Sequence, residues 1–368
     1  MSSDEKTTTT TTTTPPASPK TTTTTTDVNS TGGPDLGFSE AQQVICSVIP
    51  SLGEGRHKGQ AGRVGVVGGS KEYTGAPYFS AISALKAGAD LAYVFCSADS
   101  APVIKSYSPE LIVLPSLDQG NALEEMAPFL PRLHSLVIGP GLGRSDTVLG
   151  TVGALLGSLK EAQTPVVLDA DALHFVAQCP EIVRGYRQAV LTPNAVEFDS
   201  LYTAVFRTAR KTTSSTSSSS SPADFEAVVQ ELAARLDGVT ILRKGPVDIV
   251  SDGRHTFTCS EAGSPRRCGG QGDLLSGSLG LFSHWSHDAL RGSLENAHQN
   301  KVDGATSSSS SSPTIYQRYS PTIIAALAAS MLTRRCARLA FAKNGRSTTT
   351  TNLITEIREA FSGLFPVD

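Results

Sequence analysis

Residues 135–171 read SLVIGPGLGRSDTVLGTVGALLGSLKEAQTPVVLDAD, and this stretch decides the expected fold. Two short apolar runs, Ser135 to Ile138 and Pro165 to Leu168, flank a segment of helical length from Asp146 to Leu159. Continuous apolar runs that are closed by glycine, proline or polar residues are typical of strands buried on both faces. The stretch therefore predicts one strand–helix–strand unit of an α/β sheet.

The same alternation extends outward along most of the chain. Further short apolar runs occur at Val64 to Val67, Leu91 to Cys96, Leu111 to Leu114, Ala189 to Leu191 and Thr240 to Arg243. Other segments of helical length are Ala76 to Ala87, Asp171 to Gln178 and Pro222 to Leu236. This order predicts a doubly wound α/β sheet, in which loops at the carboxyl ends of the strands form the functional site.

Two more helices are expected at the edges of this pattern. Ser39 to Ile49 has helical spacing of its apolar residues, with Ser39 as the candidate N-cap. Thr322 to Leu332 reads as a buried helix. No apolar run approaches the ~20 residues that a membrane-spanning helix needs.

The chain has 368 residues, but four tracts are nearly pure threonine or serine: Thr7 to Thr14, Thr21 to Thr26, Ser214 to Ser221 and Ser307 to Ser312. Such tracts lack the apolar surface whose burial offsets the entropy of ordering. We therefore expect a disordered threonine-rich tail over residues 1–36 and a single folded domain over residues 37–368. Serine-rich insertions near residues 212–222 and 305–313 are expected to extend loops of that domain.

Charge and cysteine content exclude several classes of protein. Lys and Arg number 31 and Asp and Glu 34, so the formal net charge is −3. No global basic field exists to hold nucleic acid or an anionic membrane, so an anionic ligand must be bound locally. The six cysteines show neither a CxxC pair nor a zinc-ligand spacing, which favours a reducing compartment. The first residues lack a secretory segment, so we expect a cytoplasmic protein, with mitochondrial import as the alternative.

The glycine cluster Arg267-Cys-Gly-Gly-Gln-Gly-Asp273 leads directly into an apolar run. Glycines before a helix let backbone N–H groups converge on an anion, and the helix dipole favours negative charge there. The pattern is not a Walker loop, because no Lys-Ser/Thr pair follows the last glycine. Asp273 is either a helix cap or the base that accepts the proton of an attacking hydroxyl.

Two further segments offer groups for a phosphate or a metal. Leu242 to Gly253 reads as strand, turn and strand, in which Lys244 either reaches a nucleotide phosphate or is a solvated turn lysine. Asn194 and Glu197 lie three residues apart at the start of a helix and share one face of it. The pair suits water-bridged Mg²⁺, with capping of the helix by Asn194 as the alternative.

Other strand ends supply additional candidates. Gly139 to Arg144 has glycines where a backbone approaches another group closely. Asp169 and Asp171 point in opposite directions if the chain is still extended, so at most one faces the cleft. The glycines of Gly62 to Ser70 do not fit GxGxxG with a downstream acid, which argues against a Rossmann dehydrogenase.

The motifs, in chain order, are His57-Lys-Gly-Gln60, Gly68-Gly-Ser70, Tyr73-Thr-Gly-Ala-Pro77, Gly139-Pro-Gly-Leu-Gly143, Asp169-Ala-Asp171, Thr192-Pro-Asn194 with Glu197, Lys244-Gly-Pro-Val-Asp248 and Gly269-Gly-Gln-Gly-Asp273. Together they resemble the ATP-dependent NAD(P)H-hydrate dehydratase family, from about Ile45 to Phe365. One departure is Thr348-Thr-Thr-Thr-Asn352, where the family often has methionine and then aspartate. This departure concerns local packing or an oligomer contact.

The resemblance implies a ribokinase-like fold, a three-layer α/β sandwich with a central, mostly parallel sheet and helices on both faces. It implies repair of NADH and NADPH, in which ATP as co-substrate phosphorylates the added hydroxyl of the S form of the hydrate. Loss of the phosphate then regenerates the reduced nicotinamide ring. Mg²⁺ is the implied cofactor. The implied partners are the hydrates NADHX and NADPHX, an NAD(P)H-hydrate epimerase and, in a homo-oligomer, further copies of the chain.

The resemblance also assigns residues, with Asp273 as the catalytic base. The implied ATP-binding residues are Lys244, Gly245, Pro246, Val247, Asp248, Gly263, Ser264, Pro265, Arg266, Arg267, Cys268, Gly269, Gly270, Gln271 and Gly272. The implied hydrate-binding residues are Gly141, Asn194, Ala195, Val196, Glu197, Phe198, Asp199, Ser200 and Asp273. Asn194 and Glu197 are the candidates for water-mediated magnesium.

Two other functions stay open at this point. A ribokinase-like kinase of a small alcohol or vitamin precursor would share the anion site and the aspartate, but its reaction stops at the phosphate ester. The segments His57 to Gln60 and Tyr73 to Pro77 are not expected of such kinases in this form. A catalytically inactive nucleotide-binding module would have no reason to keep a carboxylate such as Asp273 beside phosphate.

Overall fold

The sheet at the centre of the molecule has nine strands in the computed structural model, which describes residues 38–53, 58–208, 222–302 and 318–367. The strands are β1 (Arg63–Val67), β2 (Leu91–Cys96), β3 (Ile112–Pro115), β4 (Ser135–Ile138), β5 (Val166–Leu168), β6 (Ala189–Leu191), β7 (Thr240–Arg243), β8 (Asp248–Ser251) and β9 (Thr256–Cys259). The tail expected over residues 1–36 and the insertions expected near 212–222 and 305–313 lie outside the described residues, apart from residue 222.

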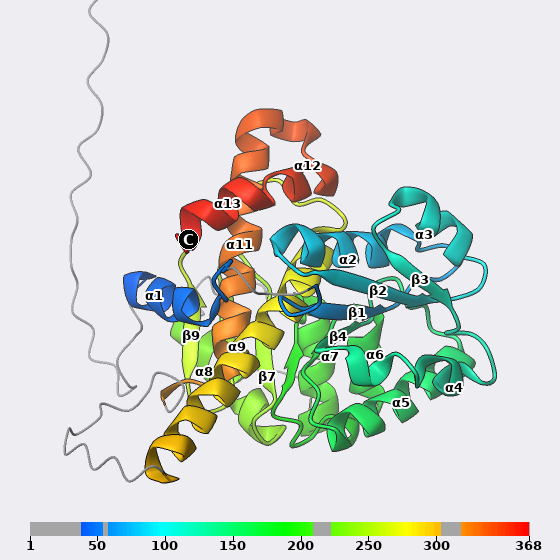
Figure 1. Cartoon of the computed structure of the whole chain (residues 1–368), viewed down its shortest axis with the longest axis horizontal. Coiled ribbons are helices and arrows are strands. Elements are labelled where there is room, and N and C mark those ends of the chain that lie inside the picture. The colour runs from blue at the N-terminus through cyan, green and yellow to red at the C-terminus, as the bar shows by residue number, and fades with distance from the viewer. Residues whose placement is uncertain (1–37, 54–57, 209–221, 303–317, 368) are drawn as a thin grey trace, which may run out of the picture. The chain divides into compact units, whose positions relative to one another are not determined.

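Strand order across the sheet is β3-β2-β1-β4-β5-β6-β7-β8-β9 (Figure 1). All neighbouring strands from β3 to β7 are parallel. The last two strands, β8 and β9, extend the sheet in antiparallel pairing. The expected mostly parallel sheet is therefore confirmed, and the strand, turn and strand of residues 242–253 form the β7–β8 hairpin.

Both faces of the sheet are buried, which explains the continuous apolar runs of the sequence. In β4, Leu136 and Ile138 belong to one core and Val137 to the other. Alternate side chains of a strand point to opposite faces, so each face needs its own apolar residues. The two cores are covered by two layers of helices.

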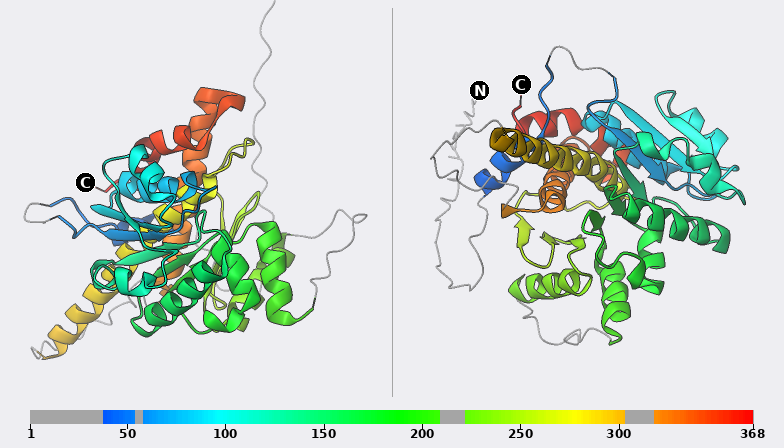
Figure 2. Two further views of the ribbon diagram at one scale, coloured as in Figure 1. Left: turned by 90° about the vertical axis from the view of Figure 1, so that its right-hand side faces the viewer. Right: turned by 60° about the horizontal axis from the view of Figure 1, so that its bottom comes forward.

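One face is covered by α1 (Phe38–Val48), α2 (Gly75–Ala87), α3 (Ala101–Tyr107), α9 (Gln271–Val302), α11 (Pro321–Asn344), α12 (Thr350–Thr355) and α13 (Ile357–Leu364). The other face is covered by α4 (Ala122–Met126), α5 (Asp146–Glu161), α6 (Asp171–Gln178), α7 (Ala195–Phe206) and α8 (Pro222–Arg235). The views of Figure 2 show these layers on either side of the strands. The three-layer α/β sandwich expected from the resemblance is confirmed.

Two sequence expectations about helices need comment. Ser39 was expected to cap the first helix, but α1 already includes Phe38, so Ser39 lies inside the first turn. The buried stretch from Thr322 to Leu332 is confirmed and belongs to the longer helix α11. Within the described parts of the chain, no helix is both long and apolar enough to cross a bilayer.

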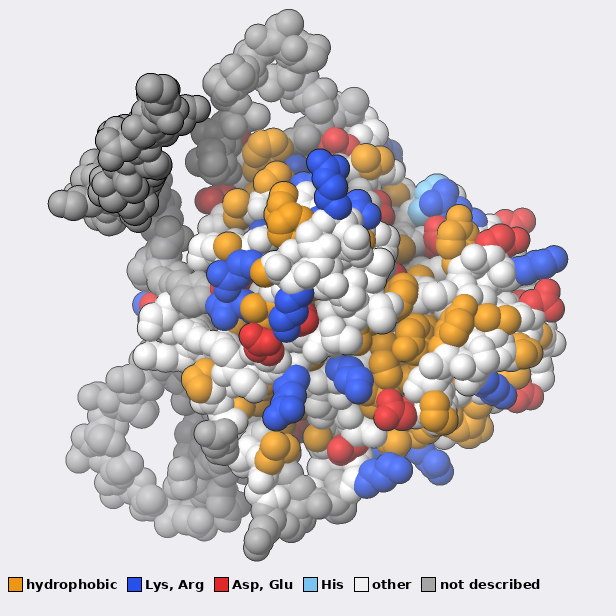
Figure 3. Space-filling view, turned by 90° about the horizontal axis from the view of Figure 1, so that it is seen from above, with side chains coloured by type: hydrophobic (Ala, Val, Ile, Leu, Met, Phe, Trp, Pro, Cys, Tyr) orange, Lys and Arg blue, Asp and Glu red, His pale blue; other side chains and the backbone are white. Residues whose placement is uncertain are grey.

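The molecular face drawn in Figure 3 carries its Lys and Arg side chains in small groups between acidic and uncharged ones. That face has no continuous basic surface. The picture agrees with a formal net charge of −3, from which only local binding of an anion was expected.

Two buried histidines lie on α9, away from its first turn. His284 is 4% exposed, and its ring lies 4.1 Å from that of His134, which precedes β4. His287 is also buried, and its Nδ1 lies 2.7 Å from the carbonyl oxygen of Ser283. Burial lowers the pKa of each of the two α9 histidines to about 4.

These histidines make stability depend on pH. Because the unfolded chain binds protons near the ordinary histidine pKa of 6.5, their contribution is present above that pH and is lost as the pH falls toward 4. Between pH 7 and pH 5 we expect each histidine to lower the free energy of unfolding by about 2 kcal/mol, out of roughly 3 kcal/mol over the full range down to pH 4. Urea denaturation at pH 7 and pH 5 measures it, and the double variant His284→Gln/His287→Gln should lose much less stability over this interval.

The matched control is His174→Gln, because the His174 ring is only partly buried and lies outside the α9 group. This variant should keep the pH dependence of the unmodified protein. An unchanged pH dependence in the double variant would show that other groups, such as carboxylates, cause the acid sensitivity.

Candidate functional site

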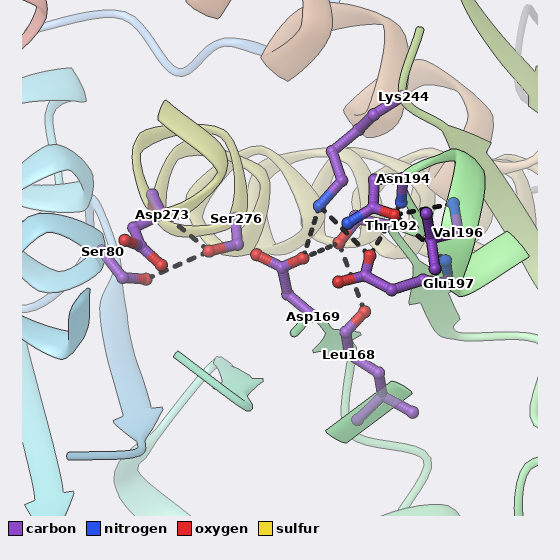
Figure 4. A network of polar contacts seen from close by, with 10 residues as sticks. All are labelled: Ser80, Leu168, Asp169, Thr192, Asn194, Val196, Glu197, Lys244, Asp273 and Ser276. Carbon is purple, nitrogen blue, oxygen red and sulfur yellow. Dashed lines mark hydrogen bonds and ion pairs between the residues drawn. The ribbon is translucent and has the colours of Figure 1, made fainter. Parts of the chain in front are cut away.

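Polar side chains from three neighbouring strand ends meet beside the start of α9 (Figure 4). Asp169 follows β5, Thr192 follows β6 and Lys244 follows β7. Because neighbouring parallel strands end at the same edge of a sheet, these residues come together where the sequence predicted a site. Glu197 in the first turn of α7 and Asp273 in the first turn of α9 complete the group.

Lys244 is held by an ion pair at the centre of this group. Its Nζ lies 2.8 Å from Oδ1 of Asp169 and 3.9 Å from Oε2 of Glu197. The Thr192 hydroxyl donates to the same Oδ1 of Asp169 at 2.8 Å. Burial by itself lowers the pKa of the lysine, but the two carboxylates outweigh burial and raise it. Lys244 is therefore a charged, partly buried group and not the solvated turn lysine of the alternative.

The Asp273 carboxylate has no such partner. No hydrogen bond between described residues reaches its oxygens, so it does not cap α9. Burial raises the pKa of this carboxyl well above the ordinary range, the negative charge of Asp169 adds to the effect, and Lys244 opposes it. Of the two roles that the sequence left open, the helix cap is therefore not seen in the structure, and the role of proton acceptor stays a prediction.

The loop before α9 has the form of an anion site. Gly270 has φ of +91°, and a Cβ there would lie 2.8 Å from the ring of Phe79. Only glycine fits this conformation and this space. Among the hydrogen bonds of the described residues, none uses the amide of Gly270 or Gly272. A Cβ on Gly272 would lie 3.6 Å from Nζ of Lys244, so the loop and the ammonium group are neighbours.

Helix α12 supports this loop from behind. The Thr350 hydroxyl donates to the carbonyl oxygen of Gly269 at 2.6 Å, and the Cys268 Sγ lies 3.4 Å from the same hydroxyl. Thr349 and Asn352 form a capping box that starts the helix. The segment that departs from the family pattern therefore makes a local packing contact with the glycine loop.

A cavity of about 600 Å³ opens beside the group. It is lined by most of the residues that the resemblance assigned to ATP: Lys244, Gly245, Pro246, Asp248, Gly263, Ser264, Arg267, Cys268, Gln271 and Gly272. The remaining lining residues are Asn194, Ala195, Arg243, Leu275, Thr333 and Arg334. Five residues assigned to ATP are not part of the lining: Val247, Pro265, Arg266, Gly269 and Gly270.

Asp248 lines the large cavity, as the ATP assignment predicts, and its carboxylate also braces the β7–β8 turn. Its buried carboxylate accepts hydrogen bonds from the Gly245 amide at 2.9 Å, from Ser330 Oγ at 2.7 Å and from Nε of Arg334 at 2.9 Å. Nη2 of Arg334 also donates to the carbonyl oxygens of Gly245 and Pro246. These hydrogen bonds from the protein make the Asp248 carboxylate a fixed point that holds the β7–β8 turn. Its negative charge repels phosphate.

The segment assigned to the hydrate has several environments. Ala195 lines the large cavity, whereas Val196, Glu197 and Ser200 line a second cavity of about 240 Å³. Asp199 and Ser200 line a groove between α6 and α7. The Phe198 side chain is fully buried in the core, with the Arg243 guanidinium 5.5 Å from its ring centre, so it supports α7 and cannot reach a ligand.

Asn194 and Glu197 cap α7 reciprocally. The Asn194 side-chain oxygen accepts from the amides of Val196 at 2.9 Å and Glu197 at 3.0 Å, and Oε2 of Glu197 accepts from the Asn194 amide at 2.8 Å. This capping box uses the Asn194 oxygen that was expected to face Mg²⁺. Within the described residues, no three acidic, histidine or cysteine side chains are grouped as metal ligands.

Gly141, in the loop after β4, contacts the segment that begins at Tyr73. It has φ of +59°, and a Cβ there would lie 2.6 Å from the carbonyl oxygen of Tyr73. In the neighbouring loop, Asp171 turns toward Arg144, whose Nε lies 2.8 Å from Oδ1. Asp169 alone joins Lys244, which confirms that one acid of this pair faces the group.

Comparison with known proteins identifies the family. Residues 64–359 match the sequence profile described as NAD(P)H-hydrate dehydratase. The chain belongs to the NAD(P)H-hydrate dehydratase family. It is 52% identical to the ATP-dependent (S)-NAD(P)H-hydrate dehydratase of Ixodes scapularis, over 90% of this chain and 98% of that protein. Identity to the protein of the same name from Homo sapiens is 50%, over 88% of this chain and 84% of that protein.

Solved structures support the fold of this dehydratase-family chain. An ADP/ATP-dependent NAD(P)H-hydrate dehydratase from Bacillus subtilis, co-crystallised with ATP/Mg²⁺, superimposes with a TM-score of 0.62 at 18% identity, covering 91% of this chain and 100% of that chain. A ribokinase-like superfamily protein from Enterococcus faecalis gives a TM-score of 0.62 at 18% identity, covering 88% and 94%. At this identity the likeness concerns the fold, and it confirms the ribokinase-like architecture.

Four residues that line the large cavity of this dehydratase-family chain were not assigned to a ligand from the sequence: Arg243, Leu275, Thr333 and Arg334. Sequence reasoning also missed Thr350, which holds the glycine loop. Arg334 carries a signal in hindsight, since it follows a long apolar run on a helix and is only 9% exposed. A buried arginine needs a buried acidic partner. The sequence does not say which acid is that partner, because the β7–β8 hairpin and α11 come together only in the tertiary structure.

The bracing role of Asp248 leads to a stability prediction. Asp248→Asn keeps the shape but leaves the Arg334 charge buried without its counter-charge. We expect the free energy of unfolding to fall by about 3 kcal/mol, as measured by urea denaturation.

The control is Asp237→Asn, which breaks an ion pair with Arg187 whose two side chains are 63% and 67% exposed. Its cost should stay below about 1 kcal/mol. If the two variants lose the same stability, Asp248 is not a brace.

Proposed function

We propose that this protein dehydrates the S form of hydrated NADH and NADPH at the expense of ATP and so restores the reduced cofactors. The supporting observation is the unpartnered Asp273 carboxylate at the N-terminus of α9, beside Lys244 and the 600 Å³ cavity. The names of relatives that are 50 to 52% identical agree with this activity. In this proposal the product is NADH or NADPH, with ADP and phosphate as by-products.

The reaction needs ATP because hydroxide is a poor leaving group. In the first step the hydroxyl oxygen of the hydrate bonds to the γ-phosphorus of ATP, its proton passes to Asp273, and ADP leaves with the electrons of the broken P–O bond. In the second step the C–O bond to phosphate breaks while a proton passes from the neighbouring ring carbon to water. Phosphate departs with the electron pair of the C–O bond, and the ring double bond forms.

The glycine loop suits the charge that develops on the transferring phosphoryl group. The amides of Gly270 and Gly272 lie at the positive end of the helix dipole and donate to no described residue, whereas the Gln271 amide donates to the Cys268 carbonyl oxygen at 3.4 Å. Preorganised donors of this kind lower the barrier. Lys244 adds positive charge next to Gly272. Asp169 orients that ammonium group through the 2.8 Å ion pair.

Charge balance in the group supports a divalent cation as the companion of ATP. One ammonium group, that of Lys244, faces the carboxylates of Asp169, Glu197 and Asp273, all of them hard oxygen ligands. When bound, Mg²⁺ supplies positive charge to the phosphates of ATP and to these acids. The unbonded oxygen of Glu197 is the group most suited to hold it through water, and Asn194 remains occupied by capping.

An enzyme restricted to the S form acts on only one of two epimers. The R hydrate then requires an epimerase, which is the partner that we propose on chemical grounds. We propose the cytoplasm as the location on the basis of the six cysteines, which show neither a CxxC pair nor a zinc-ligand spacing and so favour a reducing compartment.

The direct test is incubation of the purified protein with Mg²⁺, hydrated NADH and either ATP or ADP, followed by absorbance of restored NADH. We expect recovery with ATP. Asp273→Asn should reduce turnover by at least about a thousandfold while ATP binding stays measurable, because the amide cannot accept the proton.

If the Asp273→Asn variant keeps turnover within about tenfold of the unmodified protein, the substitution has removed less than ~1.4 kcal/mol of transition-state stabilisation. That loss is too small for the removal of a general base. Absence of recovery with either nucleotide would overturn the proposed activity itself.

The raised pKa of Asp273 gives a second prediction. A base works only when ionised, so kcat/KM should fall as the pH drops through the pKa of this carboxyl, which burial and Asp169 place above the ordinary range. Asp169→Asn removes the like charge, so the acid limb of the pH–rate profile should move to lower pH.

Asp171→Asn is the matched control, since Asp171 pairs with Arg144 and lies outside the charges that act on Asp273. Its acid limb should stay where it is. If the acid limb of the Asp169→Asn profile stays in place or moves to higher pH, Asp273 is not the titrating group.

A further inference from the structure

The small cavity of about 240 Å³ continues into the groove between α6 and α7, because His174 and Ser200 line both. At its other end the small cavity is lined by Glu197, whose Oε2 lies 3.9 Å from Nζ of Lys244. The combined space therefore runs from the group around Lys244 outward along two helices. If the hydrated nicotinamide ring reacts beside Asp273, the middle of the dinucleotide lies in the small cavity and its adenosine lies along the groove.

The middle of the hydrated cofactor is a diphosphate, which needs a positive partner. The protein has a formal net charge of −3, so this partner must be a local cation. Among the described residues that line the small cavity and the groove, Arg144 is the only lysine or arginine. Four other cations, Arg243, Lys244, Arg267 and Arg334, line the large cavity, where we propose that ATP binds.

The Arg144 guanidinium is held at one edge and open at the other. Its Nε donates to Oδ1 of Asp171 at 2.8 Å, and the Gly143 amide donates to Oδ2 of the same carboxylate at 3.1 Å. The side chain of Arg144 is nevertheless 60% exposed, whereas that of Asp171 is 18% exposed. Within the described residues, no hydrogen bond or ion pair uses Nη1 or Nη2 of Arg144. An arginine oriented in this way presents paired N–H donors to a ligand, and their geometry matches two phosphate oxygens.

The two carboxylates of the small cavity are turned toward partners within the protein. Asp171 faces the Nε edge of Arg144, away from the open edge. Oε2 of Glu197 accepts from the Asn194 amide at 2.8 Å and lies on the side of Lys244 (Figure 4). The open guanidinium edge is therefore the group that this cavity offers to an anion.

We propose that Arg144, oriented by Asp171, binds the diphosphate of the hydrated cofactor. This inference rests on the proposed function and adds to it a contact with a part of the substrate that does not react. Because the hydrates of NADH and NADPH share the diphosphate, the contact serves both. It also gives a role to the second acid of Asp169-Ala-Asp171, which turns away from Lys244 and acts as a positioning residue for the guanidinium.

The test is steady-state kinetics of the full chain with Mg²⁺, ATP and hydrated NADH. Arg144→Gln removes the charge and should raise the KM for hydrated NADH about tenfold, while kcat and the KM for ATP stay within about twofold. Arg144→Lys keeps the charge without the paired donors and should give an intermediate KM. Arg187→Gln is the matched control, because Arg187 is 67% exposed, also pairs with an aspartate, and lines neither the two cavities nor the groove.

A shortened substrate separates phosphate binding from packing. Hydrated reduced nicotinamide riboside has the same ring hydroxyl and no phosphate, so Arg144→Gln should change its kcat/KM by less than about twofold. Added KCl gives a second measurement with hydrated NADH itself. It should raise the KM of the unmodified protein and have much less effect on Arg144→Gln, which has lost the charge that salt screens.

Several outcomes would overturn the diphosphate contact. An unchanged KM for hydrated NADH in Arg144→Gln would remove it, and an equal loss with the riboside hydrate would assign the effect to packing. A rise of the KM for ATP alone would move Arg144 to the nucleotide. Failure of the proposed function is distinct from all of these, because the unmodified protein would then restore no NADH.

Discussion

The site depends on a charge constraint: one ammonium group, that of Lys244, lies among carboxylates that outnumber it. Asp169 holds the lysine at 2.8 Å, Glu197 lies at 3.9 Å, and Asp273 stands nearby without any hydrogen bond from a described residue. The shortage of positive charge, together with burial, keeps the Asp273 pKa high and makes the group receptive to a cation that accompanies ATP. The excess of carboxylates over ammonium groups thus explains both the raised pKa of the proposed base and the proposed need for Mg²⁺.

The charge constraint can persist only because the surrounding loops are fixed by ion pairs from one helix. Arg334 of α11 binds Asp248 on the β7–β8 turn, and Arg335 binds Glu261 on the loop after β9, with Nε 2.6 Å from Oε1. The two arginines are consecutive in sequence, and their acidic partners are both nearly buried. Consecutive side chains of a helix diverge, so a single turn of α11 supports both walls of the nucleotide cavity. The two ion pairs therefore keep the β7–β8 turn and the loop after β9 in a fixed conformation beside the cavity.

The two cavities suggest how two substrates meet. The large one lies along the β7–β8 turn and the glycine loop, and the smaller one lies along α6 and α7 and includes Glu197 and Asp171. Asn194 and Ala195 line the first, and Val196 and Glu197 line the second, so the capped first turn of α7 separates them. A capping box makes this dividing turn rigid. In the proposed reaction the rigid turn keeps the hydrate and the nucleotide in fixed orientation.

The sequence alone determined the alternation of strands and helices, the carboxyl-end location of the site and the residues Asp273, Lys244, Asp169 and Gly270, because buried strands and glycine loops have strong local signatures. It also gave most of the lining of the large cavity. It left Asp273 between cap and base and Asn194 between cap and ligand, since both choices depend on which neighbours supply hydrogen bonds. The brace between Asp248 and Arg334, the support of the glycine loop by Thr350 and the unpartnered Thr333 hydroxyl were decided by tertiary structure. The first two contacts join segments that are about 80 residues apart, and Thr333 lies in a cavity wall built from several distant segments. Local sequence patterns carry no information about which distant segment completes a contact.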